Sequence, residues 1–267
     1  MPQAPPPNPE NPLARLAAVM DAIREHCPWD KKQTIASIRH LSLEEVHELS
    51  EAILDEDPDE IRKELGDVLF HIVYYSRLAR EKGWFTLEEV IDGAAEKIIR
   101  RHPHVFGDAQ LNDEQAVKKS WEEIKLQERG YERSSVLDGV PASLPALLKA
   151  LRMQEKARGV GFDWPEADPV RDKVSEEWEE LQEVVAKPDA HAQREEEFGD
   201  LLFALVNYGR FLKVNPEDAL EKANRKFRRR FQSMEAQAKA QGTSLSALSL
   251  EEMEALWQQA KAEEKRK

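Results

Sequence analysis

The sequence is poor in the residues on which most other protein classes depend. It contains one cysteine, Cys27, so no disulfide can form within the chain, and this usage fits a reducing cytoplasm. Glycine occurs only 11 times and runs of β-branched residues are few, which disfavours β and α/β folds. No apolar run reaches the roughly 20 residues of a membrane helix, and no signal-peptide pattern opens the chain. We therefore expect a cytoplasmic all-α protein without a membrane partner.

Excess positive charge is also missing. Lys and Arg together number 39 against 52 Asp and Glu, and the net charge is −13. Because a chain of this charge repels duplex DNA, we expect no nucleic-acid partner. A phosphorylated small molecule can still bind, provided that divalent cations bridge its phosphates to the carboxylates.

What the sequence does have is an internal repeat. The segment 64–78 reads ELGDVLFHIVYYSRL, and the segment 197–211 reads EFGDLLFALVNYGRF, an offset of 197 − 64 = 133 residues. An acidic cluster precedes each copy, EEVHE at 44–48 and EEWEE at 176–180. A helical core needs repeated Leu and Phe, but it does not need repeated Glu and Asp at matching spacing. The pattern predicts two tandem, duplicated helical bundles that carry a chemical site.

Composition and periodicity divide the chain into four parts. They are a proline-rich, disordered leader at 1–12, an N-terminal domain at 13–126, a Gly-, Ser- and Pro-containing linker at 127–146 and a C-terminal domain at 147–267.

Turn and capping residues predict where several helices begin and end. Ser42 is expected to cap one helix, with Glu45 as its capping-box partner. Pro103 is expected to end another. The helix after Asp57-Pro58 is expected to bury one apolar stripe, which consists of Ile61, Leu65, Val68, Leu69, Ile72 and Val73.

Carboxylates recur at three-residue spacing on the acidic helices of both copies. Residues three apart share a helix face, and a short connection makes the two helices of a copy pack antiparallel. Four carboxylates then converge, and a divalent cation removes their mutual repulsion. We expect one or two Mg²⁺ ions, with Mn²⁺ as a substitute. The expected ligands are Glu177, Glu180, Glu197 and Asp200 in the second copy, and Glu45, Glu48, Glu64 and Asp67 in the first.

Other interpretations of these carboxylates stay open. They can form a solvated acidic face, and Glu45 can be a capping residue, although its equivalent Glu177 lacks a Ser or Thr three residues earlier. Glu44 and His47 form one E-x-x-H motif of the di-iron type, but such a site needs two, and the second copy has Glu179 instead of the histidine. A catalytically inert helical scaffold or regulatory partner would need no metal.

A basic face follows the carboxylates in each copy. It consists of Lys97, Arg100 and Arg101 in the first copy and of Lys226, Arg229 and Arg230 in the second. In an acidic chain such a face suggests phosphate recognition, since Arg gives bidentate contacts. The alternative is a set of cations placed near helix C-termini by the helix dipole. This alternative is stronger for the first copy, because Pro103 ends the helix just beyond Arg101.

Together these motifs resemble the MazG family of all-α nucleoside triphosphate pyrophosphohydrolases. The resemblance rests on E-E-x-x-E, then E-x-G-D, then a basic K-x-x-R-R segment, and it covers most of residues 13–260. It extends to CPWDKKQT (27–34), RRHPHVFGD (100–108), VGFDW (160–164) and KANRKFRRRF (222–231). The resemblance implies tandem MazG-type domains in a homodimer. It also implies Mg²⁺-dependent hydrolysis of a (deoxy)nucleoside triphosphate between the α- and β-phosphates, giving a monophosphate and pyrophosphate.

The same resemblance implies that the second copy is the main active site. Its four carboxylates would bind Mg²⁺, and its implied substrate-binding residues are Lys173, Asn224, Lys226, Arg230 and Trp257, with Lys226 and Arg230 stabilising the leaving pyrophosphate. The first copy has Leu41 in place of Lys173 and Ala95 in place of Asn224. Most of the turnover is therefore expected from the C-terminal half, and the first copy is expected to keep a metal site.

Overall fold

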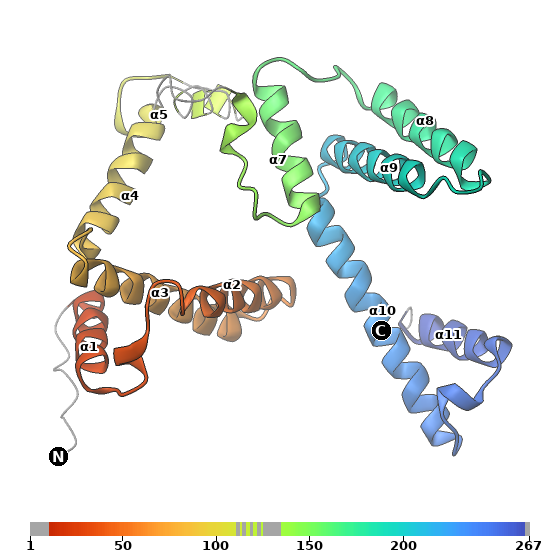
Figure 1. Cartoon of the computed structure of the whole chain (residues 1–267), viewed down its shortest axis with the longest axis horizontal. Helices are drawn as coiled ribbons and strands as arrows, with labels where there is room; N and C mark the ends of the chain where they lie inside the picture. The colour runs from red at the N-terminus through yellow and green to blue at the C-terminus, as the bar shows by residue number, and fades with distance from the viewer. Residues whose placement is uncertain are drawn as a thin grey trace. The chain divides into compact units, whose positions relative to one another are not determined.

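The computed structural model describes residues 11–110, 113, 116–117, 120–121, 124 and 135–264. Those residues form helices and connecting turns without a strand, which confirms the all-α prediction (Figure 1). The chain divides into two compact units, Met1–Ile124 and Lys125–Lys267. Each unit contains one copy of the repeat.

The described elements of the N-terminal unit are α1 (Pro12–His26), the 3-10 turn η1 (Asp30–Lys32), α2 (Arg39–Leu54), α3 (Pro58–Glu81), α4 (Leu87–Arg101) and α5 (Pro103–Phe106). Those of the C-terminal unit are η3 (Val136–Gly139), α7 (Ala146–Gly159), α8 (Ala167–Val185), α9 (His191–Phe211), α10 (Pro216–Ala240), η4 (Leu245–Ala247) and α11 (Leu250–Glu264).

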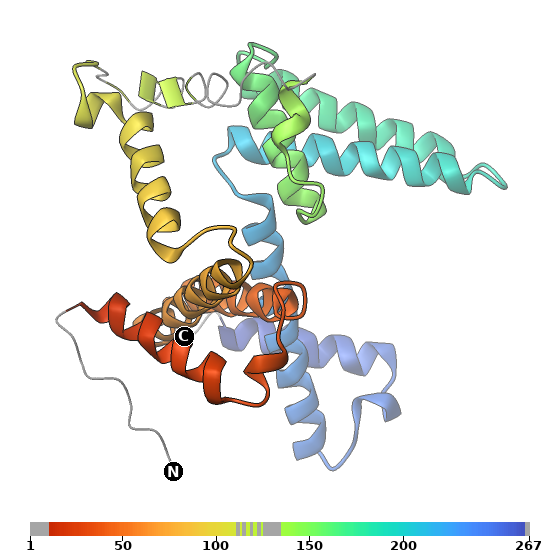
Figure 2. The ribbon, with the colours of Figure 1, turned by 60° about the vertical axis from the view of Figure 1, so that its left-hand side comes forward.

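The repeat folds into one long helical hairpin in each unit. Helix α2 packs along α3, and α8 packs along α9 (Figure 2). The hairpin connections match as well, because Glu56 and Asp189 lie 133 residues apart and adopt left-handed φ values of 54° and 56°. The sequence repeat is therefore a repeat of backbone structure, and it places the two acidic segments of each copy on adjacent helices.

Local capping chemistry determines several helix ends. The Asp57 carboxylate accepts the backbone N–H groups of Asp59 and Glu60 at the start of α3, and Thr86 forms a capping box with Glu89 at the start of α4. The prediction for Ser42 was wrong. Helix α2 begins at Arg39, so Ser42 lies inside it, because the turn at 34–38 starts the helix earlier.

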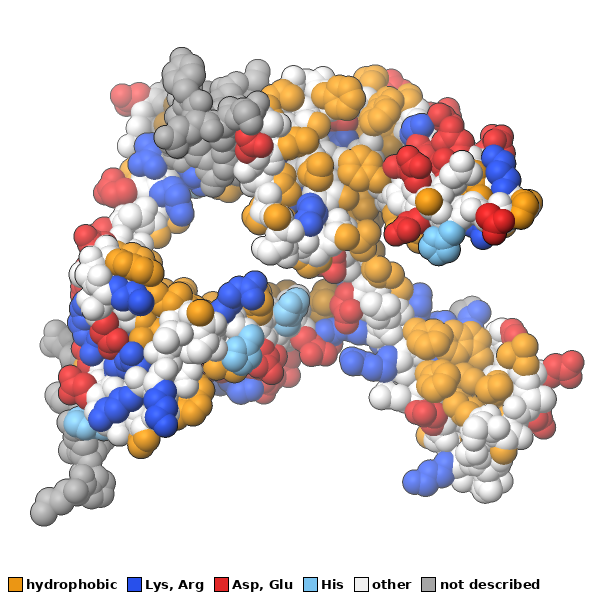
Figure 3. All heavy atoms as spheres, in the orientation of Figure 1, with side chains coloured by type: hydrophobic (Ala, Val, Ile, Leu, Met, Phe, Trp, Pro, Cys, Tyr) orange, Lys and Arg blue, Asp and Glu red, His pale blue; other side chains and the backbone are white. Residues whose placement is uncertain are grey.

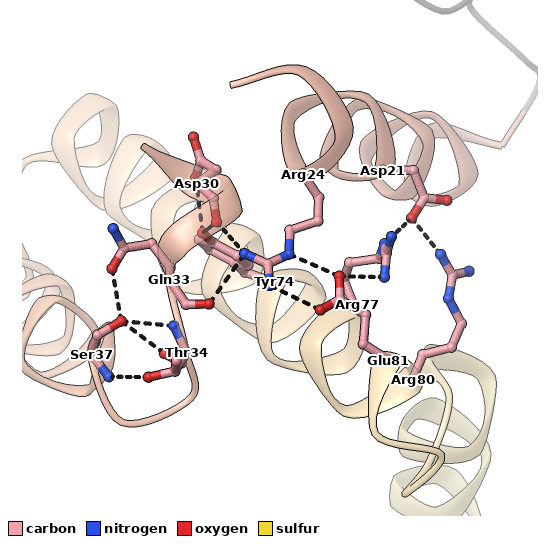
Figure 4. A network of polar contacts seen from close by, with 10 residues as sticks. All are labelled: Asp21, Arg24, Asp30, Gln33, Thr34, Ser37, Tyr74, Arg77, Arg80 and Glu81. Atoms are coloured by element: carbon pink, nitrogen blue, oxygen red, sulfur yellow. Dashed lines mark hydrogen bonds and ion pairs between the residues drawn. The ribbon is translucent and has the colours of Figure 1, made fainter. Parts of the chain in front are cut away.

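A polar network joins α1 and the turn after it to α3 (Figure 4). The buried Tyr74 hydroxyl donates to the Asp30 carboxylate at 2.9 Å. The Arg24 guanidinium donates to the backbone oxygens of Asp30 and Gln33 and pairs with Glu81 at 2.8 Å. Because the buried polar groups of this turn are paired, the network helps to hold the turn at 27–37 against α3.

The core of the N-terminal unit lies between α1, the start of α2 and the second half of α3. Its fully buried apolar members are Met20, Ile38, Val73, Tyr74 and Leu78. The C-terminal unit has two smaller clusters, one between α8 and α9 and one between α10 and α11. They consist of Leu181, Val184 and Leu201, and of Met234, Ala238 and Leu256.

The predicted buried stripe of α3 was wrong in part. Leu65, Leu69 and Ile72 are 53%, 41% and 41% exposed. Their equivalents in α9 are exposed to the same degree, and they are Phe198 (53%), Leu202 (40%) and Leu205 (44%). A two-helix hairpin covers only one face of each helix, so the opposite apolar face has no partner within the described part of its own unit.

Part of the predicted domain boundaries falls outside the described residues. This applies to residues 1–10 of the expected leader and to residues 127–134 of the expected linker. The described part of the linker contains η3, which contacts α7. No described helix is both long enough and apolar enough to cross a bilayer.

Candidate functional site

Three carboxylates meet between α2 and α3. Ligand atoms of Glu45, Glu48 and Glu64 all lie within 4.8 Å of one another, and we call these residues the N-terminal cluster. Glu64 is only 3% exposed. Burial, followed by the negative charge of Asp67, raises the pKa of Glu45. Asp67 thus acts on the cluster electrostatically, although it is not one of its three closest members.

One oxygen of the buried Glu64 has no hydrogen-bond partner in the described part of the chain. Glu64 Oε1 accepts from Lys63 Nζ at 2.9 Å, whereas Oε2 is fully buried and unpaired. A buried, unpaired carboxylate oxygen costs about 1–3 kcal/mol or more. Since Glu45 and Glu48 each bring a carboxylate oxygen within 4.8 Å of an oxygen of Glu64, a cation would fit beside this carboxylate.

The second copy builds a matching cluster between α8 and α9. Ligand atoms of Glu177, Glu197 and Asp200 lie within 4.8 Å of one another, and we call these residues the C-terminal cluster. Figure 3 shows acidic side chains gathered over this hairpin. Glu180 lies beside the cluster, where partial desolvation and the charge of Glu177 raise its pKa. The donor atoms are carboxylate oxygens, the ligands that Mg²⁺ and Mn²⁺ prefer.

A lysine distinguishes the C-terminal cluster from the N-terminal one. Lys173 Nζ lies 2.7 Å from Glu177 Oε1 and 2.8 Å from Glu176 Oε1. Its hydrogen bonds to these two carboxylates raise the pKa of Lys173. At the equivalent place in α2, Leu41 packs against the apolar core. The N-terminal cluster has a different lysine beside it, Lys63 of α3, whose Nζ lies 2.9 Å from Glu64 Oε1. The two clusters therefore differ in which helix of the hairpin supplies the cation.

The basic residues of α10 make other contacts. Arg229 Nη2 and Arg230 Nε lie 3.1 Å and 2.7 Å from the carboxylate of Glu264 in α11. Lys226 is exposed, and Asn224 donates to Glu221 at 3.4 Å. Within residues 135–264, no ion pair joins Lys226, Arg229 or Arg230 to the C-terminal cluster. The structure therefore does not bring together all the residues that the sequence suggested.

Trp257 packs on the same surface of α10. Its ring centroid lies 5.4 Å from that of Phe227, and the Arg230 guanidinium lies 5.5 Å above it. The half-buried tryptophan also packs against the core cluster of α10 and α11. Trp257, Arg230 and Glu264 thus form one aromatic and charged group.

Sequence reasoning missed a histidine beside the N-terminal cluster. His71 is 7% exposed, its Nε2 lies 3.8 Å from Glu45 Oε1, and burial lowers its pKa. Comparison of the two copies could have found it, because Ala204 occupies the equivalent position (204 − 71 = 133). The histidine that the sequence did single out, His47, is exposed, as is Glu44. The geometry therefore does not support the E-x-x-H motif of the di-iron interpretation.

Comparisons with known proteins converge on one family. The family model of the MazG nucleotide pyrophosphohydrolase domain matches residues 33–106 and 168–234. These segments contain both carboxylate clusters, and Trp257 lies beyond the second.

Similar proteins extend over nearly the whole chain. The nucleoside triphosphate pyrophosphohydrolase of Escherichia coli K12 is 44% identical over 259 residues, which are 95% of this chain and 98% of that protein. The nucleoside triphosphate pyrophosphohydrolase/pyrophosphatase MazG of Thermotoga maritima is 45% identical over 248 residues, 92% of this chain and 94% of that protein. The uncharacterized protein YabN of Bacillus subtilis is 48% identical over 240 residues, 90% of this chain and 49% of its own length.

Proposed function

The chain belongs to the MazG nucleotide pyrophosphohydrolase family, and on this premise we propose that it hydrolyses (deoxy)nucleoside triphosphates between the α- and β-phosphates. The products are a nucleoside monophosphate and pyrophosphate. One observation carries the assignment of the reaction to the C-terminal half: Lys173 lies beside the C-terminal cluster, whereas Leu41 occupies its place in the N-terminal unit. The N-terminal cluster has Lys63 beside it, but this lysine lies on the second helix of its hairpin and is not equivalent to Lys173. A lysine on the first helix, beside converging carboxylates, suits a site for metal-bound phosphates.

We assign Mg²⁺ to the C-terminal cluster, with Mn²⁺ as a substitute. The fit rests on donor chemistry, because Glu177, Glu197 and Asp200 offer only oxygen and Glu180 adds another carboxylate beside them. A bound divalent ion supplies charge neutralisation of the phosphates and activation of water. The residues themselves hold the ion, and their combined negative charge makes its retention strongly favourable.

The chain's own side chains then account for binding and charge stabilisation. A carboxylate of the cluster accepts the proton of the water that attacks the α-phosphorus in line with the leaving pyrophosphate. Lys173 moves from Glu177 toward phosphate oxygens, and Lys226 and Arg230 stabilise the charge that grows on the leaving group. The reaction uses one water and releases one proton, so no further reactant is required.

Substrate contact by the α10 cations requires an exchange of partners. Arg230 and Arg229 contact Glu264, so each must replace a carboxylate oxygen by a phosphate oxygen. Trp257 stacks near the base, and Asn224 lies beside the phosphates in this proposal. Arg suits such an exchange because its planar guanidinium binds carboxylate and phosphate with the same bidentate geometry.

We further propose that the protein acts as a cytoplasmic homodimer. The stripes formed by Leu65, Leu69 and Ile72 and by Phe198, Leu202 and Leu205 are exposed in both units. Repeated apolar stripes of this kind are typical of surfaces that a partner covers. We also propose that the N-terminal domain comprises residues 13–126 and the C-terminal domain residues 147–267. The N-terminal domain contributes little of the turnover.

Product analysis tests the proposed reaction. Each of the eight common (deoxy)nucleoside triphosphates is incubated with the full chain, and pyrophosphate and orthophosphate are measured separately. We expect pyrophosphate and monophosphate in equal amounts as first products. Orthophosphate and a nucleoside diphosphate as first products would contradict cleavage between the α- and β-phosphates.

A second prediction concerns Lys226. Lys226→Ala should lower kcat/KM by about 10–150-fold, because a lost hydrogen bond to a charged group costs roughly 1.5–3 kcal/mol. The melting temperature should change little, since exposed substitutions usually alter stability by about 0.5 kcal/mol or less. The matched control is Lys239→Ala, which removes another exposed lysine of α10. If Lys226→Ala lowers the melting temperature but leaves kcat/KM unchanged, Lys226 stabilises the fold and does not bind phosphate.

A further inference from the structure

The two carboxylate clusters differ in a donor atom. His71 Nε2 lies 3.8 Å from Glu45 Oε1, at the Glu45 side of the N-terminal cluster. This distance is too long for a hydrogen bond. It is close to the roughly 3.3–3.5 Å between two ligands that sit about 2.0–2.2 Å from one tetrahedral ion. Ala204 stands at the equivalent position of α9, so α9 offers no imidazole nitrogen at that position.

Hydrogen bonds orient the His71 ring with Nε2 toward the carboxylates. His71 Nδ1 lies 2.7 Å from Ser42 Oγ, which also lies 2.8 Å from the Tyr75 hydroxyl. Ser42 donates its own proton to the Ile38 backbone oxygen at 3.3 Å. Its Oγ then accepts from Nδ1–H, which leaves the lone pair on Nε2, and this tautomer is assigned from the network. An oriented imidazole with one nitrogen held in this way is typical of metal-ligating histidines.

The orienting serine belongs to the N-terminal unit only. Val174 stands in α8 where Ser42 stands in α2 (174 − 42 = 132, the offset between Glu45 and Glu177). Histidine and serine therefore occur together in one copy and are both absent from the other. The pair is an addition to the repeated carboxylates and is not needed to build the hairpin, since α8 and α9 form it without them.

The unpaired oxygen of Glu64 independently indicates a cation-binding position. Glu64 is 3% exposed, and its Oε2 has no hydrogen-bond partner among the described residues. Glu45 and Glu48 place two further carboxylate oxygens within 4.8 Å of one oxygen of Glu64. A protein group could satisfy this oxygen only by donating a proton, whereas a metal ion would satisfy all three carboxylates at once.

We propose that the N-terminal cluster, with His71 as its nitrogen ligand, binds a divalent transition-metal ion of the Zn²⁺ type in preference to Mg²⁺. Imidazole suits Zn²⁺, whereas carboxylate and water suit Mg²⁺, so the same repeated hairpin holds two kinds of ion. Ser42 is a positioning residue that acts through His71. The inference rests on the proposed function in taking both clusters as metal sites, and it assigns the N-terminal ion no part in phosphate cleavage.

Calorimetric titration of the metal-free full chain with Zn²⁺ and, separately, with Mg²⁺ tests this proposal. All titrations use a chain that carries Glu197→Gln, which weakens metal binding by the C-terminal cluster. The tightest Zn²⁺ binding that is then measured belongs to the N-terminal cluster. In this background, His71→Gln should weaken Zn²⁺ binding at least about 10-fold, the lower scale for losing even an outer-shell partner. Mg²⁺ binding should stay unchanged, because carboxylates provide it. Ser42→Ala should weaken Zn²⁺ binding about 10-fold.

Two comparisons separate ligation from packing. His47→Gln removes the exposed histidine of α2 and should leave Zn²⁺ binding unchanged. The melting temperature of each metal-free variant is measured with and without Zn²⁺, and the Zn²⁺-induced increase should shrink only when His71 or Ser42 is changed. Unchanged Zn²⁺ affinity in His71→Gln, or equal losses for Zn²⁺ and Mg²⁺, would overturn the proposal.

The test is independent of catalysis. The titrations contain no nucleotide, and the C-terminal cluster is weakened in all variants that are compared. Absence of pyrophosphate release would contradict the proposed function and leave the Zn²⁺ result standing. Absence of a tight, His71-dependent Zn²⁺ site would contradict only the present inference.

Discussion

Glu197→Gln is expected to lower kcat by at least about 10²-fold, the scale for losing one preorganised electrostatic group. Glu197 belongs to the C-terminal cluster with Glu177 and Asp200. The amide keeps the size of the side chain but removes its charge and one strong ligand oxygen. Steady-state kinetics with a saturating nucleoside triphosphate and with varied Mg²⁺ measures the loss and shows whether more ion restores part of it.

The repeat provides the matched control for this variant. Glu64→Gln makes the same change at the equivalent position of α3, 133 residues earlier. It should leave most of the activity, because the N-terminal unit has Leu41 at the position that Lys173 occupies in the C-terminal unit. Similar losses in kcat from both substitutions would show that both halves are catalytic. Circular dichroism and melting temperature establish that each variant is folded, since Glu64 is buried and Glu197 is half-buried.

Removal of divalent ions should have an even larger effect. With excess EDTA we expect turnover to fall by at least about 10³-fold, because a bound ion contributes several kcal/mol to charge stabilisation and about 1.36 kcal/mol corresponds to tenfold in rate. Mg²⁺ or Mn²⁺ added beyond the chelator should restore it. The physical reason is electrostatic: without cations, the C-terminal cluster repels the triphosphate that it must hold.

The chelation result requires a control for folding. Helical content in EDTA should remain, since the packing of α8 on α9 rests on apolar side chains such as Leu181, Val184 and Leu201. Loss of activity together with loss of helix would indicate a structural ion. Full activity in excess EDTA would contradict a metal-dependent mechanism.

Local sequence patterns were sufficient for the helices and for the choice of carboxylates. Asp57-Pro58 predicted a helix start that the structure contains, because capping bonds involve residues only two or three apart. The repeated Glu and Asp spacing likewise named the three carboxylates that meet in each copy, although Asp67 and Glu180 lie outside these groups. Helical periodicity determines which residues share a helix face. A short connection between two helices determines which of their faces are in contact.

Patterns within one helix could not show what lies opposite each side chain. Ser42 had the features of a capping residue, but the turn at 34–38 started α2 earlier and brought Ser42 to His71 and Tyr75 of α3. Leu65 was expected in the core, but no described helix of its unit covers that side of α3. These outcomes depend on how elements far apart in the sequence pack.

The sequence by itself determined an all-α chain with two copies of one hairpin, most of the acidic residues that converge in each copy, and the difference between Lys173 and Leu41 at equivalent positions. These features follow from helical periodicity, capping and comparison of the copies. Only the tertiary structure decided that Glu64 Oε2 is buried without a partner, that His71 faces Glu45, and that Arg229 and Arg230 contact Glu264. Burial and pairing depend on the neighbours that packing brings from other elements, and spacing along one helix does not contain that information.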